Sequence, residues 1–160
     1  MHCSARIGVN LLGNLIGSII VAGIVAGSGV LDLSGDPGRM LAGLVAAKTH
    51  KPALALFLRG VMCNVLVCLA IWSQSRTENA VAKMILMAWC MCAFVASGFE
   101  HVVANMTTLA LGVFLQIPEA SAYGILKNLT FVGSGNLVGG AVFVGAVYYV
   151  IGKAEHTVSC

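Results

Sequence analysis

Charged residues are scarce in this sequence, and their scarcity argues against a soluble fold. Asp, Glu, Lys and Arg together make up 9% of the chain, against roughly a quarter in an ordinary soluble domain. Apolar residues reach 59% of the 160 positions, so the chain cannot build the charged surface that keeps a soluble domain in solution. The net charge of +3 comes without a basic run or interleaved aromatic and basic residues. Nucleic acid is therefore not an expected partner.

Catalytic and metal-binding patterns are missing as well. The sequence shows no paired carboxylates, no nucleophile beside a base, and no haem or metal-ligand spacing. No two cysteines form a C-x-x-C pair, and four of the six lie inside apolar stretches: Cys63, Cys68, Cys90 and Cys92. Free cysteine in such surroundings behaves as a small hydrophobic residue. We therefore expect no enzyme, no cofactor and no metal site.

Long uncharged runs are what the sequence has instead. Residues 7–31 and 128–152 are two runs of 25 residues without a charge, and 53–75 is interrupted only by Arg59. About 20 apolar residues in a helix cross the hydrocarbon core of a bilayer. These runs predict membrane-spanning helices, and we expect residues 1–160 to form a single transmembrane domain.

The stretch 84–118 is too long for one crossing and is interrupted by Ser97-Gly-Phe-Glu-His101. Two interpretations remain open: two short helices that both cross, or one crossing built from half-helices at 84–98 and 100–117. We favour the second, because irregular backbone at membrane depth survives where it lines a cavity in channels and transporters. The expected fold is thus an all-α membrane protein with about four crossings. Its expected place is the cell (inner) membrane, as a multi-pass protein.

Ionisable side chains at membrane depth are costly, which makes Glu100 and His101 candidate functional residues. The alternatives are that both lie at a membrane surface, or that Glu100 only braces the break through hydrogen bonds. A half-helix that begins after the break would direct its N-terminal N–H groups toward a small anion. His101 could donate a hydrogen bond or a proton to that anion, and Asn105 lies one turn further along. Arg59 is left open as either an interfacial anchor or an internal partner.

Two similar hexapeptides lie far apart in the chain, Gly13-Asn-Leu-Ile-Gly-Ser18 and Gly135-Asn-Leu-Val-Gly-Gly140. Small residues spaced four apart let helices approach closely in lipid, so helix packing alone would explain both. Their matched places in two spans also fit structural repeats, a common feature of transporters.

Three segments together resemble the formate/nitrite transporter family. Phe94-Val-Ala-Ser-Gly-Phe-Glu-His-Val-Val-Ala-Asn-Met106 is similar to the family's broken fifth helix. Arg59-Gly-Val-Met-Cys-Asn64, with Leu66 to Trp72, resembles its fourth span, and Gly135 to Gly140 resembles its sixth. The resemblance implies an aquaporin-like helical bundle that assembles as a homopentamer, with a pore for a small monovalent anion in each protomer.

The resemblance also implies roles for individual residues. The family's central histidine, which contacts the anion and protonates it or polarises its passage, matches His101. Its vestibule lysine matches Lys48, and the asparagine of its fourth span matches Asn64. Together these groups would draw the anion in, so that a neutral acid crosses apolar constrictions closed to a bare charge. The implied partners are the lipid bilayer, the anion and a proton, and the expected substrate pathway contains His101, Asn64, Lys48, Glu100 and Asn105.

The substrate is ranked by resemblance to the family's branches. The segments 69–72, 76–78 and 104–107, with Trp89-Cys90, are more similar to the nitrite-type branch than to the formate-type branch. We therefore expect nitrite first, formate next and hydrosulfide third.

One departure from the family pattern is the number of spans. The family has six spans, and this chain is expected to correspond to the last four, without the first span and the broken second span. The alternative function that follows is a truncated, non-transporting membrane subunit that only packs with complete homologues. Replacement of His101 would separate the two hypotheses, because only transport requires that side chain.

Overall fold

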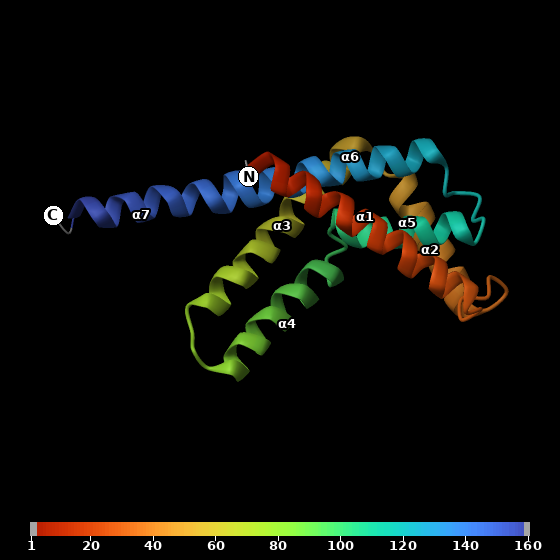
Figure 1. Ribbon diagram of the computed structural model, residues 1–160, viewed down its shortest axis with the longest axis horizontal. Coiled ribbons are helices and arrows are strands. Elements are labelled where there is room, and N and C mark those ends of the chain that lie inside the picture. Colours follow the sequence, from red (N-terminus) through yellow and green to blue (C-terminus); the bar gives the residue numbers. More distant parts are fainter. Residues whose placement is uncertain (1–2, 159–160) are drawn as a thin grey trace. The chain divides into compact units, whose positions relative to one another are not determined.

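The computed structural model describes residues 3–158, with side-chain burial for residues 5–151 and 153. The regular secondary structure of this part is all helical, which confirms the expected all-α class. The helices in chain order are α1 (Cys3–Gly27), α2 (Asp36–His50), α3 (Ala53–Ser75), α4 (Ala80–Ala96), α5 (Val102–Phe114), α6 (Ala122–Val138), the π-helix η1 (Gly139–Ala146) and α7 (Val147–Val158) (Figure 1).

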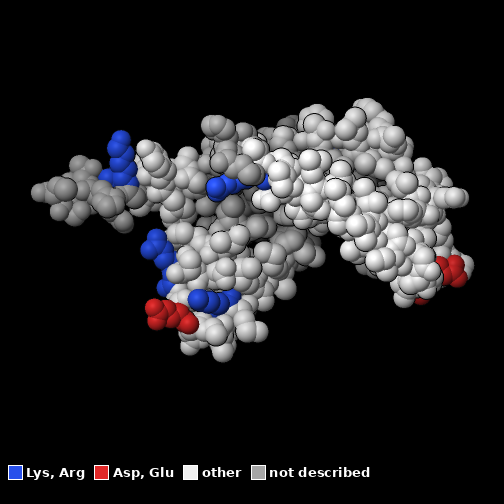
Figure 2. All heavy atoms as spheres, viewed as in Figure 1, with Lys and Arg blue, Asp and Glu red and all other residues white. Residues whose placement is uncertain are grey.

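Among the described residues, three helical segments are long and apolar enough to cross a membrane: Ala5–Gly27, Ala53–Ser75 and Ala122–Ile151. The helices α4 and α5 are apolar but shorter. On the face shown in Figure 2, charged side chains occupy small areas, and broad uncharged surfaces lie between them. These helices overlap the expected spans at 7–31, 53–75, 84–98 with 100–117, and 128–152, whose positions in a bilayer stay a prediction.

The chain divides into two units. The first contains the residues up to Ala53 together with Val102–Thr130, and the second contains Leu54–His101 and the residues from Phe131 onward. In the first unit α1 packs along α5, and α2 also contacts α5. A core of Leu41, Val45, Leu109 and Ile117 joins α2 to α5 and the residues after it. The hydroxyl groups of Ser18 and Thr107 link α1 to α5 at 3.0 Å.

The second unit depends on close approach between α3 and the helix from Phe131 onward. A Cβ atom added to Gly135 would lie 2.2 Å from the carbonyl oxygen of Phe57, and one on Gly139 would lie 2.3 Å from that of Val61. On α3, a Cβ atom added to Gly60 would lie 2.7 Å from the carbonyl oxygen of Val132. The small residues of the second hexapeptide therefore serve helix packing. The first hexapeptide differs, because added Cβ atoms on Gly13 and Gly17 would meet no atom within 4 Å.

Aromatic and basic side chains gather where α3 ends. Trp72 stacks on Tyr148 of α7 with ring centroids 4.7 Å apart, and the Arg76 guanidinium lies 5.1 Å from the centre of the Trp72 ring. Amphipathic rings with a cation are typical of the level where a membrane meets water. The cluster is thus consistent with a polar end of the α3 span at Arg76.

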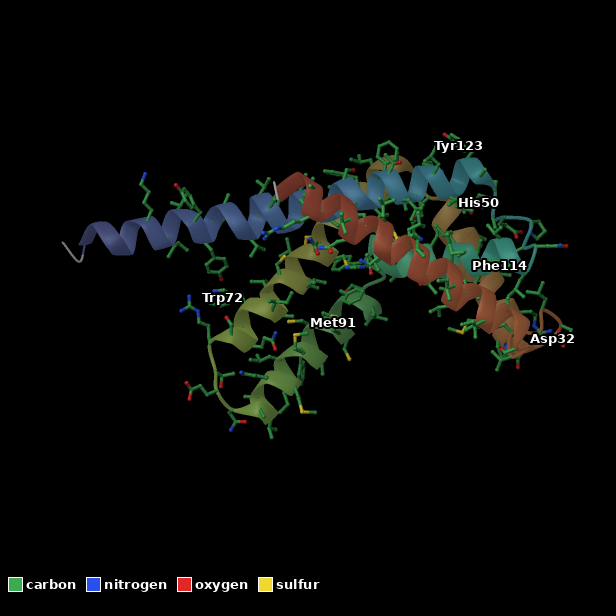
Figure 3. The ribbon with its side chains drawn as sticks, viewed as in Figure 1. Asp32, His50, Trp72, Met91, Phe114 and Tyr123 are labelled. Atoms are coloured by element: carbon green, nitrogen blue, oxygen red, sulfur yellow. The ribbon has the colours of Figure 1, made fainter. Side chains whose placement is uncertain are left out.

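A tight turn joins α1 to α2, with Asp32 at its tip (Figure 3). The Asp32 carboxylate accepts hydrogen bonds from the Ser34 hydroxyl at 2.6 Å and from its backbone N–H at 2.9 Å. These bonds favour the charged form and lower the pKa of Asp32 below its ordinary value. Pro37 in the first turn of α2 then starts the helix, which carries Lys48 near its end.

The same termination motif closes α4 and α5. Gly98 has a φ of +65°, and backbone N–H groups reach back from Gly98 to Val95 O and from Phe99 to Phe94 O. After α5, Gln116 has a φ of +53°, with bonds from Gln116 to Val113 O and from Ile117 to Gly112 O. Both are Schellman motifs, in which glycine is the usual left-handed residue. Gln116 therefore bears a conformational cost that Gly98 avoids.

Because Gly98 and Gln116 both have a left-handed backbone, substitutions at the two positions should have opposite effects on stability. Gln116→Gly should stabilise the protein by about 1 kcal/mol, because the left-handed conformation no longer meets a Cβ atom. Gly98→Ala should destabilise it by about 1–2 kcal/mol for the converse reason. Thermal unfolding of the detergent-solubilised protein measures both. A shift of the two variants in the same direction would contradict the assignment of the motifs.

Candidate functional site

The break between α4 and α5 covers residues 97–101. The flanking helices stop short of the expected half-helices at 84–98 and 100–117, because Gly98 ends α4 at Ala96 and the next helix starts only at Val102. α5 ends at Phe114, three residues before the expected end of the half-helix at 117, where Gln116 takes its left-handed conformation. His101 is thus the residue immediately before α5 and is not part of that helix.

Side chains from α3 and α6 hold the backbone of the break. Arg59 Nη1 donates to the Gly98 carbonyl oxygen at 2.8 Å, and the Glu100 N–H donates to the Arg59 carbonyl oxygen at 3.4 Å. Asn136 Nδ2 donates to the Glu100 carbonyl oxygen at 3.0 Å and to that of Gly60 at 2.9 Å. Arg59 therefore has a partner within the second unit, while its role as an interfacial anchor stays a prediction. Irregular backbone in an apolar chain persists because such donors replace the lost helical bonds.

Glu100 and His101 differ in their exposure. Glu100 is buried, with 3% of its surface exposed, whereas His101 is half-buried. The His101 ring lies beside the Phe94 ring of α4, with centroids 6.5 Å apart and the planes tilted by 41°. The break thus positions a half-buried imidazole beside an aromatic ring.

A second polar cluster lies in the first unit. Lys48 Nζ donates to Asn105 Oδ1 at 2.6 Å, Asn105 Nδ2 donates to Asn128 Oδ1 at 2.8 Å, and Asn128 Nδ2 donates to the Lys48 carbonyl oxygen at 3.0 Å. The two asparagines are buried, and Lys48 is half-buried. The cluster connects α2, α5 and α6 and holds a positive charge at its partly accessible corner.

Asn64 inserts its side chain against the last long helix. Its Nδ2 donates to the Asn136 carbonyl oxygen at 2.6 Å, and a Cβ atom on Gly140 would lie 2.6 Å from the same nitrogen. The helix widens from α to π geometry at Gly139, three residues beyond that carbonyl. A side chain inserted into the helical hydrogen-bond ladder is a known cause of such irregularity. Asn64 therefore has a packing role here, and its place in a substrate pathway stays a prediction.

The five expected pathway residues fall into two groups. Lys48 and Asn105 bond directly in the first unit; the backbone of Glu100 is linked to Asn64 through Asn136 in the second unit, which also holds His101. Sequence reasoning missed Asn128 and Asn136 as parts of these clusters. Both are amides within an otherwise apolar run, a signal that could have found them, since a buried amide requires partners.

Comparison with known proteins gives consistent results. The family model described as formate/nitrite transporter matches residues 3–150. The nitrite transporter NirC of Escherichia coli is 47% identical over 150 residues, which cover 92% of this chain and 55% of NirC. A solved structure described as an FNT family ion channel has a TM-score of 0.83 and 43% identity, covering 92% of this chain and 59% of that one. A pentameric formate channel with formate bound has a TM-score of 0.76 and 31% identity, covering 88% and 63%.

These similarities confirm the expected fold class, and they place the described helices within a known channel architecture. The chain spans about half the length of the curated relatives that it matches. Those relatives are described as transporters and channels, and the chain is a multi-pass membrane protein. By the match over residues 3–150, it belongs to the formate/nitrite transporter family.

Proposed function

We propose that this chain forms part of a pore that carries a small monovalent anion across the cell membrane. Nitrite is the first choice, formate the second and hydrosulfide the third. The order rests on the similarity to a nitrite transporter at 47% identity and to a formate channel structure at 31%. The proposal concerns transport through the membrane without chemical conversion of the anion.

The helix break that ends in His101 carries this proposal. An apolar helix pair interrupted by five residues would be unstable in lipid unless other groups satisfied the freed carbonyls. Here Arg59 and Asn136 donate to the carbonyls of Gly98 and Glu100. Such an arrangement supports a maintained opening in the helix, with the half-buried His101 at its edge.

His101 and Lys48 would act on the anion in different ways. The Lys48 ammonium, half-buried and held by Asn105, attracts an anion toward the pore. His101 donates a hydrogen bond or a proton, because transfer of an unpaired charge through an apolar constriction is prohibitive. The species that crosses the narrowest part is then the neutral acid or a strongly hydrogen-bonded anion, and a proton accompanies it.

The proposed assembly is a homopentamer in the lipid bilayer. A structural relative at a TM-score of 0.76 is described as pentameric, and the large exposed apolar side chains of α1 suit either lipid or neighbouring protomers. Each protomer of the pentamer would carry its own pore.

Anion uptake into sealed vesicles that contain the purified chain tests the proposal. Nitrite, formate and hydrosulfide are offered separately at equal concentration and pH, and uptake by empty vesicles is subtracted. We expect nitrite to enter fastest, formate more slowly and hydrosulfide slowest. A different order would overturn the substrate ranking and leave the pore itself in place.

Absence of uptake for all three anions, from protein shown to be folded and inserted, would contradict transport by this chain. That outcome would support the second candidate, a membrane subunit that packs with complete homologues and moves nothing by itself. Co-reconstitution with a complete homologue, followed by size analysis of the assembly, then measures the packing role directly.

A further inference from the structure

Asn128 on α6 is the most deeply buried member of the Lys48 cluster. None of its surface is exposed, and 1% of Asn105 is exposed. Both polar ends of the Asn128 amide have partners, since Nδ2 donates to the Lys48 carbonyl oxygen and Oδ1 accepts from Asn105 Nδ2. The Lys48 carbonyl lies in the last turn of α2, where the helix supplies no donor. Asn128 thus satisfies a helix end and reaches a second amide.

The donors and acceptors in this cluster determine how the two asparagine amides are oriented. A backbone carbonyl can only accept, so the Asn128 atom that faces it must be the NH₂ group. The Asn128 oxygen then faces Asn105, which must present its own NH₂ group in return. The remaining Asn105 atom is its oxygen, and this oxygen faces the Lys48 ammonium, which can only donate. The chain of hydrogen bonds therefore runs from the Lys48 carbonyl through Asn128 and Asn105 to the Lys48 ammonium.

We propose that Asn128 is a positioning residue for the anion-attracting lysine. By orienting the Asn105 amide, it directs the Asn105 oxygen at Lys48 and fixes where the ammonium lies. This inference rests on the proposed function, because the value of a fixed ammonium is the attraction of an anion. Asn128 itself touches neither the ammonium nor, in this role, the anion.

Loss of the Asn128 amide has a specific consequence. An apolar side chain of similar size, as in Asn128→Leu, removes the acceptor that Asn128 offers to the Asn105 NH₂ group. Asn128 then no longer constrains the orientation of the Asn105 amide, and an NH₂ group turned toward the Lys48 ammonium would place two donors against each other. The bond from the Lys48 ammonium to the Asn105 oxygen would weaken, while the charge of the chain stays the same.

Kinetics of nitrite uptake by the full chain in vesicles test the inference through a double-mutant cycle. Asn128→Leu and Asn105→Leu should each raise the KM for nitrite about tenfold, as expected for lost bonds to a charged group, with a smaller change in kcat. The double variant should be no worse than Asn105→Leu, because Asn128 acts through Asn105. Ser18→Ala is the matched control: it removes a partly buried hydrogen bond between α1 and α5 outside the cluster and should keep the wild-type KM.

A second measurement does not depend on transport. With ¹⁵N-labelled asparagine in lipid nanodiscs, the side-chain NH₂ signal of Asn105 should be protected from exchange in wild type and in Ser18→Ala. It should lose that protection in Asn128→Leu. Absence of nitrite uptake by the wild-type protein would contradict the proposed function. Hydrogen exchange at the Asn105 NH₂ group would still determine the orientation of Asn105. Wild-type KM together with a protected Asn105 signal in Asn128→Leu would overturn the inference.

Discussion

Gly135→Ala should destabilise the protein by about 3 kcal/mol, since overpacking at a close contact between backbones cannot be relieved by a rotamer change. The new methyl group would lie 2.2 Å from the Phe57 carbonyl oxygen and 3.1 Å from the Val61 nitrogen. Neither atom can yield without displacement of α3. The displacement would also disturb Asn136, the neighbour of Gly135, which donates to the carbonyls of Gly60 and Glu100. Thermal unfolding in detergent measures the loss.

The matched control is Gly13→Ala, at the corresponding position of the first hexapeptide. A methyl group there would meet no atom within 4 Å, and alanine forms helix better than glycine by up to about 1 kcal/mol. The same chemical change should therefore destabilise at one position and be neutral or stabilising at the other. Equal effects at both positions would contradict the packing described for α3 and α6.

His101→Ala should lower nitrite uptake at least about 100-fold, the lower end of what a positioned proton donor contributes. Alanine removes the imidazole that would donate a proton to the anion, and leaves the backbone bonds from Arg59 and Asn136 in place. The opening would persist while the chemistry that lets an anion cross is lost. The rate of uptake at saturating nitrite is the quantity to compare.

His50→Ala supplies the control for that substitution. His50 is exposed and lies at the end of α2 (Figure 3), and it belongs to the first unit, whereas the break belongs to the second. It should transport like wild type. Thermal unfolding of both variants separates a lost function from a lost fold. Equal uptake by His101→Ala and His50→Ala, from equally stable proteins, would show that His101 has no role in transport.

Much of the local structure follows from the sequence, because apolar runs and the residues that interrupt them determine it. The uncharged runs 7–31 and 128–152 predicted apolar helices, and Ser97 to His101 predicted a break, since glycine and ionisable residues rarely continue an apolar helix. Helix ends were less well predicted. The extent of the break follows from a left-handed Gly98, and the end of α5 from a left-handed Gln116, a conformation that glutamine rarely adopts.

The clusters could not be predicted from the residues alone, because they depend on contacts between distant segments. Arg59 donates to a carbonyl 39 residues away, and Asn128 to one 80 residues away. The sequence marked Arg59 as unusual but left its partner open, and it marked neither Asn128 nor Asn136. The two hexapeptides show the same limit. Their sequences are similar, but Gly135 lies in a close helix contact, whereas a Cβ atom on Gly13 would meet no atom within 4 Å.

An anion pathway through the membrane that uses His101 is tested by following internal pH in sealed vesicles while nitrite is added outside. Wild type, His101→Ala and empty vesicles are compared side by side. We expect rapid acidification with wild type and a rate close to that of empty vesicles with His101→Ala. Acidification by wild type that the His101→Ala variant fully retains would contradict a transport role for His101.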